Sequence, residues 1–227
     1  MLRRIGEVIM DSTDFNNARN VQALAKIAIN SSVRELMHSA QEWPFALSTK
    51  TQTLATDGTA TYAFPTDFSS VDWESFYLKQ LTAANNQPKR LPVLSYTQYL
   101  DTARPIEDQT GAGGYGVPEA VYQTQNGFFG VTPKSDQAYQ IEYKYWRFPA
   151  DLVEANDECI VPSRFDSVVI DGAMTYMMLY RSNEQSAAIH RDKFDNGIKT
   201  MRRLLLDEPL TMRSTMIVNA LSSPRVM

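Results

Sequence analysis

The sequence predicts an α+β fold in which an α-helical bundle, made of a long N-terminal helix and a C-terminal helix pair, carries an inserted antiparallel β-rich domain. Apolar residues recur at helical spacing near the N-terminus, polarity alternates with a period of two through the middle, and helical spacing returns after Pro149. Because helices bracket the β-rich stretch, the first and last helices are expected to pack together. The predicted boundaries are 1–46 and 150–208 for the bundle, 47–149 for the β domain and 209–227 for an extended C-terminal arm.

The first helix is expected to run from about Asp14 to Glu42. Polar residues at 11–14 offer N-caps, and Pro44 would end the helix. Trp43 lies next to this end, and such a large side chain is rarely left in water, so it is expected to fill the core. The apolar stripe of the helix consists of Val21, Leu24, Ile27, Ala28, Leu36, Met37 and Ala40.

Five to seven strands are expected next, mostly antiparallel, because the connections are too short for helical crossovers. Asp57-Gly58 divides the alternating stretch 48–64 and is typical of a two-residue hairpin turn. The Gln-Asn-Gly sequence at 125–127 predicts a second hairpin, between strands at 117–124 and 128–131.

The clearest strand spans 139–146, and one of its faces is expected to be buried. The residues on this face are Tyr139, Ile141, Tyr143 and Tyr145. Shorter strands are expected at 73–78 and 91–96, and residues 102–116 are expected to form a long polar loop.

Two helices are expected after the strands. Pro162 suits the first turn of one helix, and the other runs from about Glu184 to Asp207, where Pro209 stops it. Residues 210–227 have apolar side chains without a clean period, so we expect an arm that becomes ordered when a partner holds it.

The composition is that of a globular protein and argues against several classes of function. The chain is 43% hydrophobic and 21% charged, with a net charge of −4. A protein that binds DNA without sequence preference usually carries a strongly basic domain, and no stretch approaches the ~20 apolar residues of a membrane span. The charge is uneven, because residues 190–227 carry a net charge of +3 and the residues before them −7. A basic tail of this kind favours an acidic partner.

No residue is predicted to serve catalysis, a cofactor or a metal. The single cysteine, Cys159, follows two carboxylates that would raise its pKa, and the two histidines, His38 and His190, lie far apart on predicted helices. Residues 111–116 match the GxGxxG pattern, but no strand precedes them and no helix follows them. A loop is therefore expected there, and not a dinucleotide site.

Four short motifs are spread along the chain in a fixed order. They are Trp43-Pro44-Phe45, Tyr62-Ala63-Phe64-Pro65-Thr66-Asp67-Phe68, Val131-Thr132-Pro133 with the strand and the Tyr145-Trp146-Arg147-Phe148-Pro149 stretch that follow it, and Ile160-Val161-Pro162-Ser163-Arg164-Phe165. In this order, over about residues 15–205, the chain resembles the head–tail adaptor (connector) proteins of tailed bacteriophages, including the tail tubular protein A group. The loop at 102–116 departs from the pattern of that family and leaves the tail-side partner open.

The resemblance implies a structural protein of the virion, made in the host cytoplasm and located at the head–tail junction, with no enzymatic activity and no cofactor. Such adaptors form a ring, a dodecamer in the family, beneath the portal protein; they extend the DNA ejection channel and dock the tail nozzle or tail tube protein. Double-stranded DNA would pass the channel without sequence-specific binding, and no membrane takes part. The resemblance also places the arm in crevices of the portal, where the expected contact residues are Arg213, Leu221, Pro224, Arg225, Val226 and Met227.

The residues leave two other functions open. A soluble β-rich module could bind a ligand or peptide through an aromatic face formed by Trp73, Tyr77, Tyr96 and Tyr99. Such a module would be a stable monomer or dimer with a saturable small ligand. An enzyme that uses carboxylates alone, such as a glycosidase, would need two of them about 5–10 Å apart in a cleft.

Overall fold

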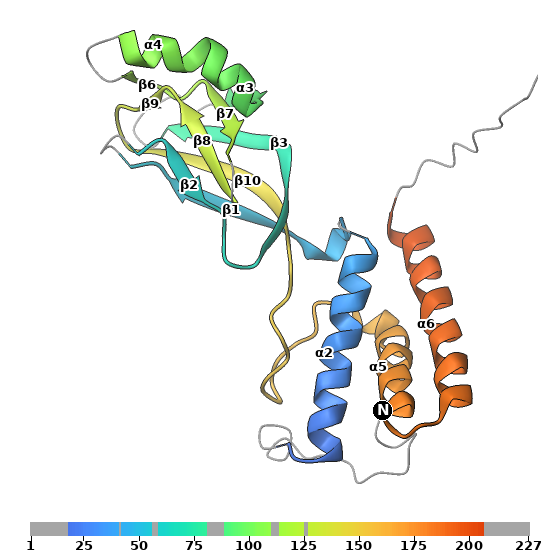
Figure 1. The fold of residues 1–227 in the computed structure, drawn as a ribbon. Helices are drawn as coiled ribbons and strands as arrows, with labels where there is room; N and C mark the ends of the chain where they lie inside the picture. Colours follow the sequence, from blue (N-terminus) through green and yellow to red (C-terminus); the bar gives the residue numbers. More distant parts are fainter. Residues whose placement is uncertain are drawn as a thin grey trace, which may run out of the picture.

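The computed structural model describes residues 18–40, 42–55, 59–80, 89–109, 114–124 and 127–206, and its α+β architecture confirms the predicted class (Figure 1). The helices are α2 (Val21–Ser39), α3 (Tyr96–Gln98), α4 (Arg104–Gln109), α5 (Asp166–Tyr180) and α6 (Glu184–Leu205), joined by the single turns η2 (Pro44–Ala46) and η4 (Ser163–Phe165) and the π-helical η3 (Tyr99–Ala103). The strands within these residues are β1 (Leu47–Thr53), β2 (Thr61–Ala63), β3 (Phe68–Gln80), β4 (Lys89–Arg90), β5 (Val93–Leu94), β6 (Tyr115–Gly116), β7 (Ala120–Gln123), β8 (Phe128–Thr132), β9 (Lys134–Ser135) and β10 (Tyr139–Arg147).

Two four-stranded sheets form most of the β part. The first has the order β1-β10-β3-β4 and is antiparallel, and the second has the order β2-β8-β7-β5, with β5 and β7 parallel. A parallel pair, β6 and β9, stands apart from them. Buried side chains of both sheets form one cluster, in which Phe129 lies 5.3 Å from the rings of Phe76 and Tyr143 on the other sheet. The sheets therefore pack face to face.

Strand β10 confirms the alternation that predicted it. Tyr139, Ile141, Tyr143 and Tyr145 are buried, and the residues between them are at least partly exposed. The strand pairs with β1 on one side and β3 on the other. A central strand with one buried face is where a period of two is clearest.

The hairpin predicted around Asp57-Gly58 is wrong. Strand β1 pairs over all of its residues with β10, whereas β2 pairs with β8 in the other sheet, and residues 56–58 lie outside the described residues. The long β10 gives β1 a partner that the three-residue β2 does not match in length. The second hairpin is confirmed as β7–β8, with Gly127 at a φ of 73° beside its turn, of which residues 125–126 lie outside the described residues.

Residues 96–109 are helical, which corrects the predicted loop 102–116, while the strand predicted at 91–96 is confirmed only as the short β5 at 93–94. Ser95 accepts a hydrogen bond from the Gln98 N–H at 3.3 Å, and the Gln98 side chain accepts one from the Ser95 N–H at 2.9 Å. This capping box starts α3. The helical turns then carry the chain from β5 to the parallel β7, so the assumption that no connection contains a helical crossover is also wrong.

The strand count of five to seven is too low, and one strand is longer than expected. Strands β4, β5, β6 and β9 have two residues each, which is too short to show a period of two. Strand β3 runs from Phe68 to Gln80 and contains the expected 73–78.

The helical part consists of α2, α5 and α6, which lie side by side below the sheets in Figure 1. Helix α2 begins at Val21 and ends at Ser39, so the predicted helix from Asp14 to Glu42 is too long. Residues 18–20 are not helical, and Asn20 has a φ of 52°, while the caps expected at 11–14 lie outside the described residues. Helices α5 and α6 confirm the predicted pair closely.

Trp43 is fully buried, as predicted, and belongs to a second hydrophobic core that joins α2, α5 and α6. Its indole N–H donates to the Leu36 oxygen at 3.1 Å, which satisfies a carbonyl near the end of α2. The core of the helices and the core of the sheets are thus separate clusters, connected after α2 by η2 and after β10 by a long segment.

Candidate functional site

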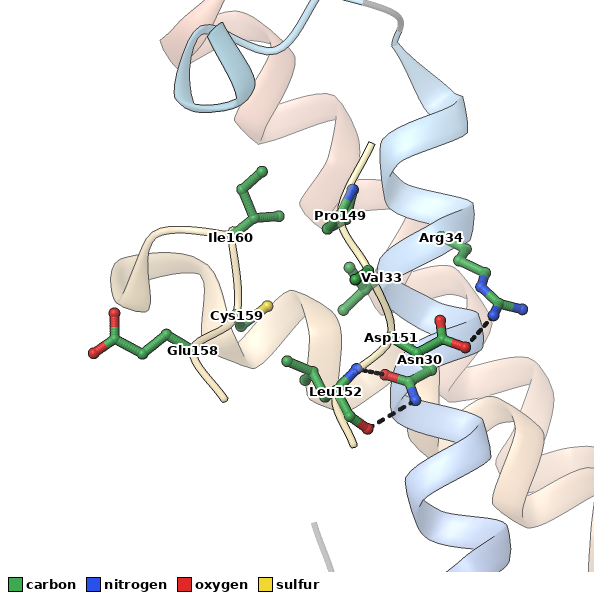
Figure 2. Close-up of a pocket in the computed structure, with 10 residues that line it drawn as sticks. Asn30, Val33, Arg34, Pro149, Asp151, Leu152, Glu158, Cys159 and Ile160 are labelled. Atoms are coloured by element: carbon green, nitrogen blue, oxygen red, sulfur yellow. Dashed lines mark hydrogen bonds and ion pairs between the residues drawn. The ribbon is translucent and has the colours of Figure 1, made fainter. Parts of the chain in front are cut away.

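Residues 148–161, here called the strap, connect β10 to η4 and run along α2 without regular secondary structure (Figures 1 and 2). Three side chains of α2 hold it. Lys26 donates to the Val153 oxygen, and Arg34 forms an ion pair with Asp151. Between them, Asn30 donates to the Leu152 oxygen at 3.2 Å and accepts from the Leu152 N–H at 3.0 Å.

These three side chains recur every four residues, which is why they can act together. Positions i, i+4 and i+8 of a helix lie above one another on one stripe. The strap runs in the opposite direction to α2, so the helix residues 34, 30 and 26 meet strap residues 151, 152 and 153 in turn. The strap is therefore attached residue by residue along two turns of α2.

The strap then turns around Asp157. One oxygen of its carboxylate accepts hydrogen bonds from the N–H groups of Val153 at 2.6 Å and Glu154 at 2.7 Å. These backbone donors, first that of Glu154 and then that of Val153, lower the pKa of Asp157. The ionised carboxylate is thus stabilised in a structural role and is not suited to act as a general acid.

Cys159 is part of the strap, and Figure 2 shows its sulfur directed toward α2. It is half-buried beside a cavity of about 20 Å³, room for about one water molecule, which is lined by Asn30 and Val33 of α2 and by the strap. Burial raises the pKa of its thiol, with a smaller contribution from the charge of Asp166. Its half-buried position before η4 is the one expected from the sequence, but burial, and not the two preceding carboxylates, is the main cause of the raised pKa.

A larger groove of about 660 Å³ separates the strap from the end of the β part. Asp67 and Arg147 line it from the β side, and Asp151, Asp157 and Glu158 line it from the strap. The Asp67 carboxylate accepts a hydrogen bond from the Tyr145 hydroxyl at 3.1 Å, which ties this wall to the β core. The groove is open and mainly acidic.

A polar link joins the three helices on the other side of α2. Glu35 of α2 accepts a hydrogen bond from the Tyr176 hydroxyl of α5 at 2.8 Å and lies 2.5 Å from the Arg191 guanidinium of α6. Arg191 also pairs with Asp195 one turn further along α6. Further along, Arg202 of α6 donates to the Ser39 oxygen at the end of α2.

The histidines take part in packing. His190 Nδ1 lies 3.0 Å from the Asp171 carboxylate, joining α6 to α5, and the His38 ring lies 5.0 Å from Phe148 at the start of the strap. Neither contact was predicted. The helical spacing placed both histidines on helices but could not say which residues face them.

The aromatic face considered for a ligand-binding module does not form. Tyr99 is buried, with its ring stacked 3.7 Å from Tyr122, and Trp73 packs against the β core at 5.6 Å from Phe76. Tyr77 and Tyr96 remain exposed. The pattern of the sequence did not reveal that residues 96–109 fold back onto the sheet.

The other sequence-based candidates fall partly outside the described residues. This holds for all the predicted arm residues, Arg213, Leu221, Pro224, Arg225, Val226 and Met227, and for 111–113 of the glycine-rich loop. Gly114, at a φ of 62°, leads into β6, which consists of the last two residues of the GxGxxG pattern. The next element after the pattern is strand β7, not a helix, as expected.

Two kinds of site are absent from the described part of the chain. No three His, Cys, Asp or Glu side chains gather there in a way that would hold a metal ion. None of the helices between residues 18 and 206 has the length and apolar character needed to cross a membrane.

Comparison with known proteins identifies the family. Residues 1–216 match the family described as SU10 adaptor protein, and none of the curated proteins matches the chain. This family suggests a phage head–tail adaptor, so it implies a structural protein of the virion that assembles with portal and tail proteins, and a non-enzyme. The resemblance drawn from the four motifs is confirmed at the level of phage adaptors, while the tail tubular protein A-like assignment stays a prediction. The chain belongs to the SU10 adaptor protein family.

Proposed function

We propose that the protein forms a ring beneath the portal of a tailed phage, extends the DNA ejection channel and docks the tail nozzle or tail tube. The observation that carries this proposal is the family match over residues 1–216, which spans both the helical part and the β part. A dodecamer and the tail tubular protein A-like subfamily belong to the same proposal.

The proposed structural units correspond to the two hydrophobic cores. Residues 1–46 and 150–208 form a helical unit, 47–149 an inserted β unit, and 209–227 an arm. The separate clusters of buried residues support this division, because each unit then has a core that can hold its shape while the units adjust to different partners.

The arm is proposed to bind the portal. Arg213 and Arg225 would meet acidic grooves, and Leu221, Val226 and Met227 would fill apolar pockets, with Pro224 keeping the tip from becoming helical. A segment that orders on docking can cover a large surface and can still be released during assembly.

The overall charge suits a channel through which DNA moves. The chain carries a net charge of −4, so the body of a ring would repel or tolerate the DNA backbone and would not bind it. Sequence-specific DNA contacts are not part of the proposal.

Deleting residues 210–227 tests the proposal. We expect the full chain to sediment with the purified portal protein and the truncated chain not to, while circular dichroism and the unfolding midpoint stay unchanged. The variant Arg213→Ala/Arg225→Ala should weaken docking mainly at low salt, and Leu221→Ala/Val226→Ala at all salt concentrations, because only the charged contacts are screened. Normal docking by the truncated chain contradicts the role of the arm.

A further inference from the structure

The helical part has two unlike sides, which face in opposite directions from α2. Lys26, Asn30 and Arg34 hold the strap, whereas Glu35 and Ser39 contact α6. At about 100° per residue, the two sets lie about 160° apart around the helix axis. The strap and the outer face of α6 therefore form opposite sides of the three-helix layer, and Figure 1 shows the strap and α6 on opposite sides of α2.

Each side exposes apolar side chains, and these lie at the same level along the helices. A Cβ atom on Gly172 would meet Ser32 Oγ at 2.2 Å and Phe194 Cε2 at 2.7 Å, so Ser32 and Phe194 share one level. Helices α2 and α6 run in the same direction in Figure 1. Ile27 and Ile189 each lie five residues before these positions, and a rise of about 1.5 Å per residue then places them level with each other.

The exposed fractions show that these are surface residues and not part of the core. Ile27 is 60% exposed, Val153 of the strap 57% and Ile189 of α6 56%. The Val153 oxygen accepts a hydrogen bond from Lys26, the residue before Ile27, so Val153 lies at about the level of Ile27 along α2. Ile27 and Val153 on the strap side thus lie at about the same level along the helices as Ile189 on the α6 side.

About one helical turn beyond Ile27 and Ile189, the strap side is acidic and the α6 side carries a lysine. The strap carries four carboxylates and no lysine or arginine. Its exposed Glu158 lines the cavity beside Asn30 and Val33, which bracket the level of Ser32, and its side chain points away from α2 in Figure 2. Lys193 is exposed, directly precedes Phe194 and shares a stripe with Ile189, and no other described residue forms an ion pair with it.

We infer that the strap side of one subunit packs against the outer face of α6 in a second copy of this chain. Ile189 packs between Ile27 and Val153 of the neighbouring copy, and Lys193 pairs with its Glu158. Because the two surfaces differ, the contact is head-to-tail, and such contacts generate closed rings when the rotation closes. The inference rests on the proposed function, and it names the surfaces through which the ring forms.

A charge swap tests the pairing, with the full chain, the portal protein and native mass as the readout. Lys193→Glu makes both sides acidic at this level, and Glu158→Lys makes both basic, so each variant alone should reduce the ring fraction about tenfold or more. An equal mixture of the two should restore it, because each surface then meets its opposite. The matched control is Lys199→Glu, which makes the same charge change on α6 but lies about 120° around the helix from Lys193.

Cysteine cross-linking tests the apolar contact and the direction of assembly. In a Cys159→Ser background under a mild oxidant, Val153→Cys/Ile189→Cys should give a ladder of cross-linked species up to the ring. Neither single variant should cross-link, because a head-to-tail contact never brings two copies of the same residue together. Cross-linking of Ile189→Cys alone indicates a two-fold contact and overturns the inference.

The controls distinguish failure of ring formation from failure of the proposed contact surfaces. If the wild-type chain forms no ring with the portal, the proposed function fails and the inference fails with it. If wild-type rings form but the mixture of Lys193→Glu and Glu158→Lys does not recover them, or Lys199→Glu disrupts them equally, only the inference is overturned.

Discussion

The Asn30 side chain and the Leu152 main chain, 122 residues apart, form two hydrogen bonds with each other, at 3.2 Å and 3.0 Å. The amide of Asn30 thus pairs with the strap much as a neighbouring β-strand would. It lies between the Lys26 and Arg34 contacts, whose partners are more exposed, so it holds the middle of the strap in place.

Replacing Asn30 by alanine should loosen the strap. The Leu152 N–H and oxygen are partly buried, and leaving them unpaired costs about 1–3 kcal/mol. We expect a lower free energy of unfolding in urea and faster hydrogen exchange at residues 150–158. Arg34→Ala is the matched control, because it removes an exposed ion pair on the same stripe and should cost about 1 kcal/mol or less. Equal losses for the two variants would contradict this account of the strap.

Gly172→Ala should destabilise the helical part. The added Cβ would meet Ser32 Oγ at 2.2 Å and Phe194 Cε2 at 2.7 Å, so α2 or α6 must move. Overpacking of this kind costs about 1–3 kcal/mol, more than the helix propensity of alanine returns. Adding Ser32→Ala should recover part of the loss, because one of the two contacts disappears, and thermal unfolding measures both. A Gly172→Ala protein as stable as wild type would show that the helices are not this close.

Tyr143→Phe should leave the protein as stable as before or more stable. The Tyr143 hydroxyl is buried and has no hydrogen-bond partner in the described part of the chain. Removing it also removes the free-energy cost of taking an unpaired hydroxyl out of water. Tyr139→Phe is the matched control on the same buried face. The Tyr139 hydroxyl donates to Asp136 at 2.9 Å, and its loss should cost about 1 kcal/mol. Opposite signs in urea unfolding are the expected result, and a larger loss for Tyr143→Phe would show that its hydroxyl has a partner.

Alkaline pH should destabilise the β part. Burial first, and then the charges of Tyr145 and Asp67, raise the pKa of Tyr143 to about 12, and burial also raises the pKa of Tyr122 and Tyr99. The folded state thus keeps these protons longer than the unfolded state, in which tyrosine titrates near pH 10. Stability is therefore complete below about pH 10 and falls as the pH rises toward 12. Urea midpoints between pH 8 and 11.5 should show this fall, and a smaller one for Tyr143→Phe; a flat profile would contradict the burial of these hydroxyls.

The sequence could predict those helices and strands whose pattern of apolar residues is visible within the segment itself. The alternation of β10 and the helical spacing of α5 and α6 reflect burial of one face, which each segment shows by itself. The turn at Asp57-Gly58 is also a local signal, but it does not say which strand β1 will join, and the long β10 was the better partner. The Ser95–Gln98 capping box was a readable helix start that the strand interpretation of 91–96 passed over.

The candidate site could not be predicted in the same way. Its side chains on α2 and their partners on the strap are more than a hundred residues apart, and no periodicity links them. Two signals were available: the recurrence of Lys26, Asn30 and Arg34 every four residues, and four carboxylates without a basic residue in 148–161. Both become informative only when the strap is known to lie on α2.

Native mass of the full chain, measured by mass photometry with and without the portal protein, tests the central claim most directly. The adaptor account predicts a monomer alone and a ring-sized complex with the portal. An unchanged monomer in both samples would contradict it and would direct attention to a small-ligand-binding module.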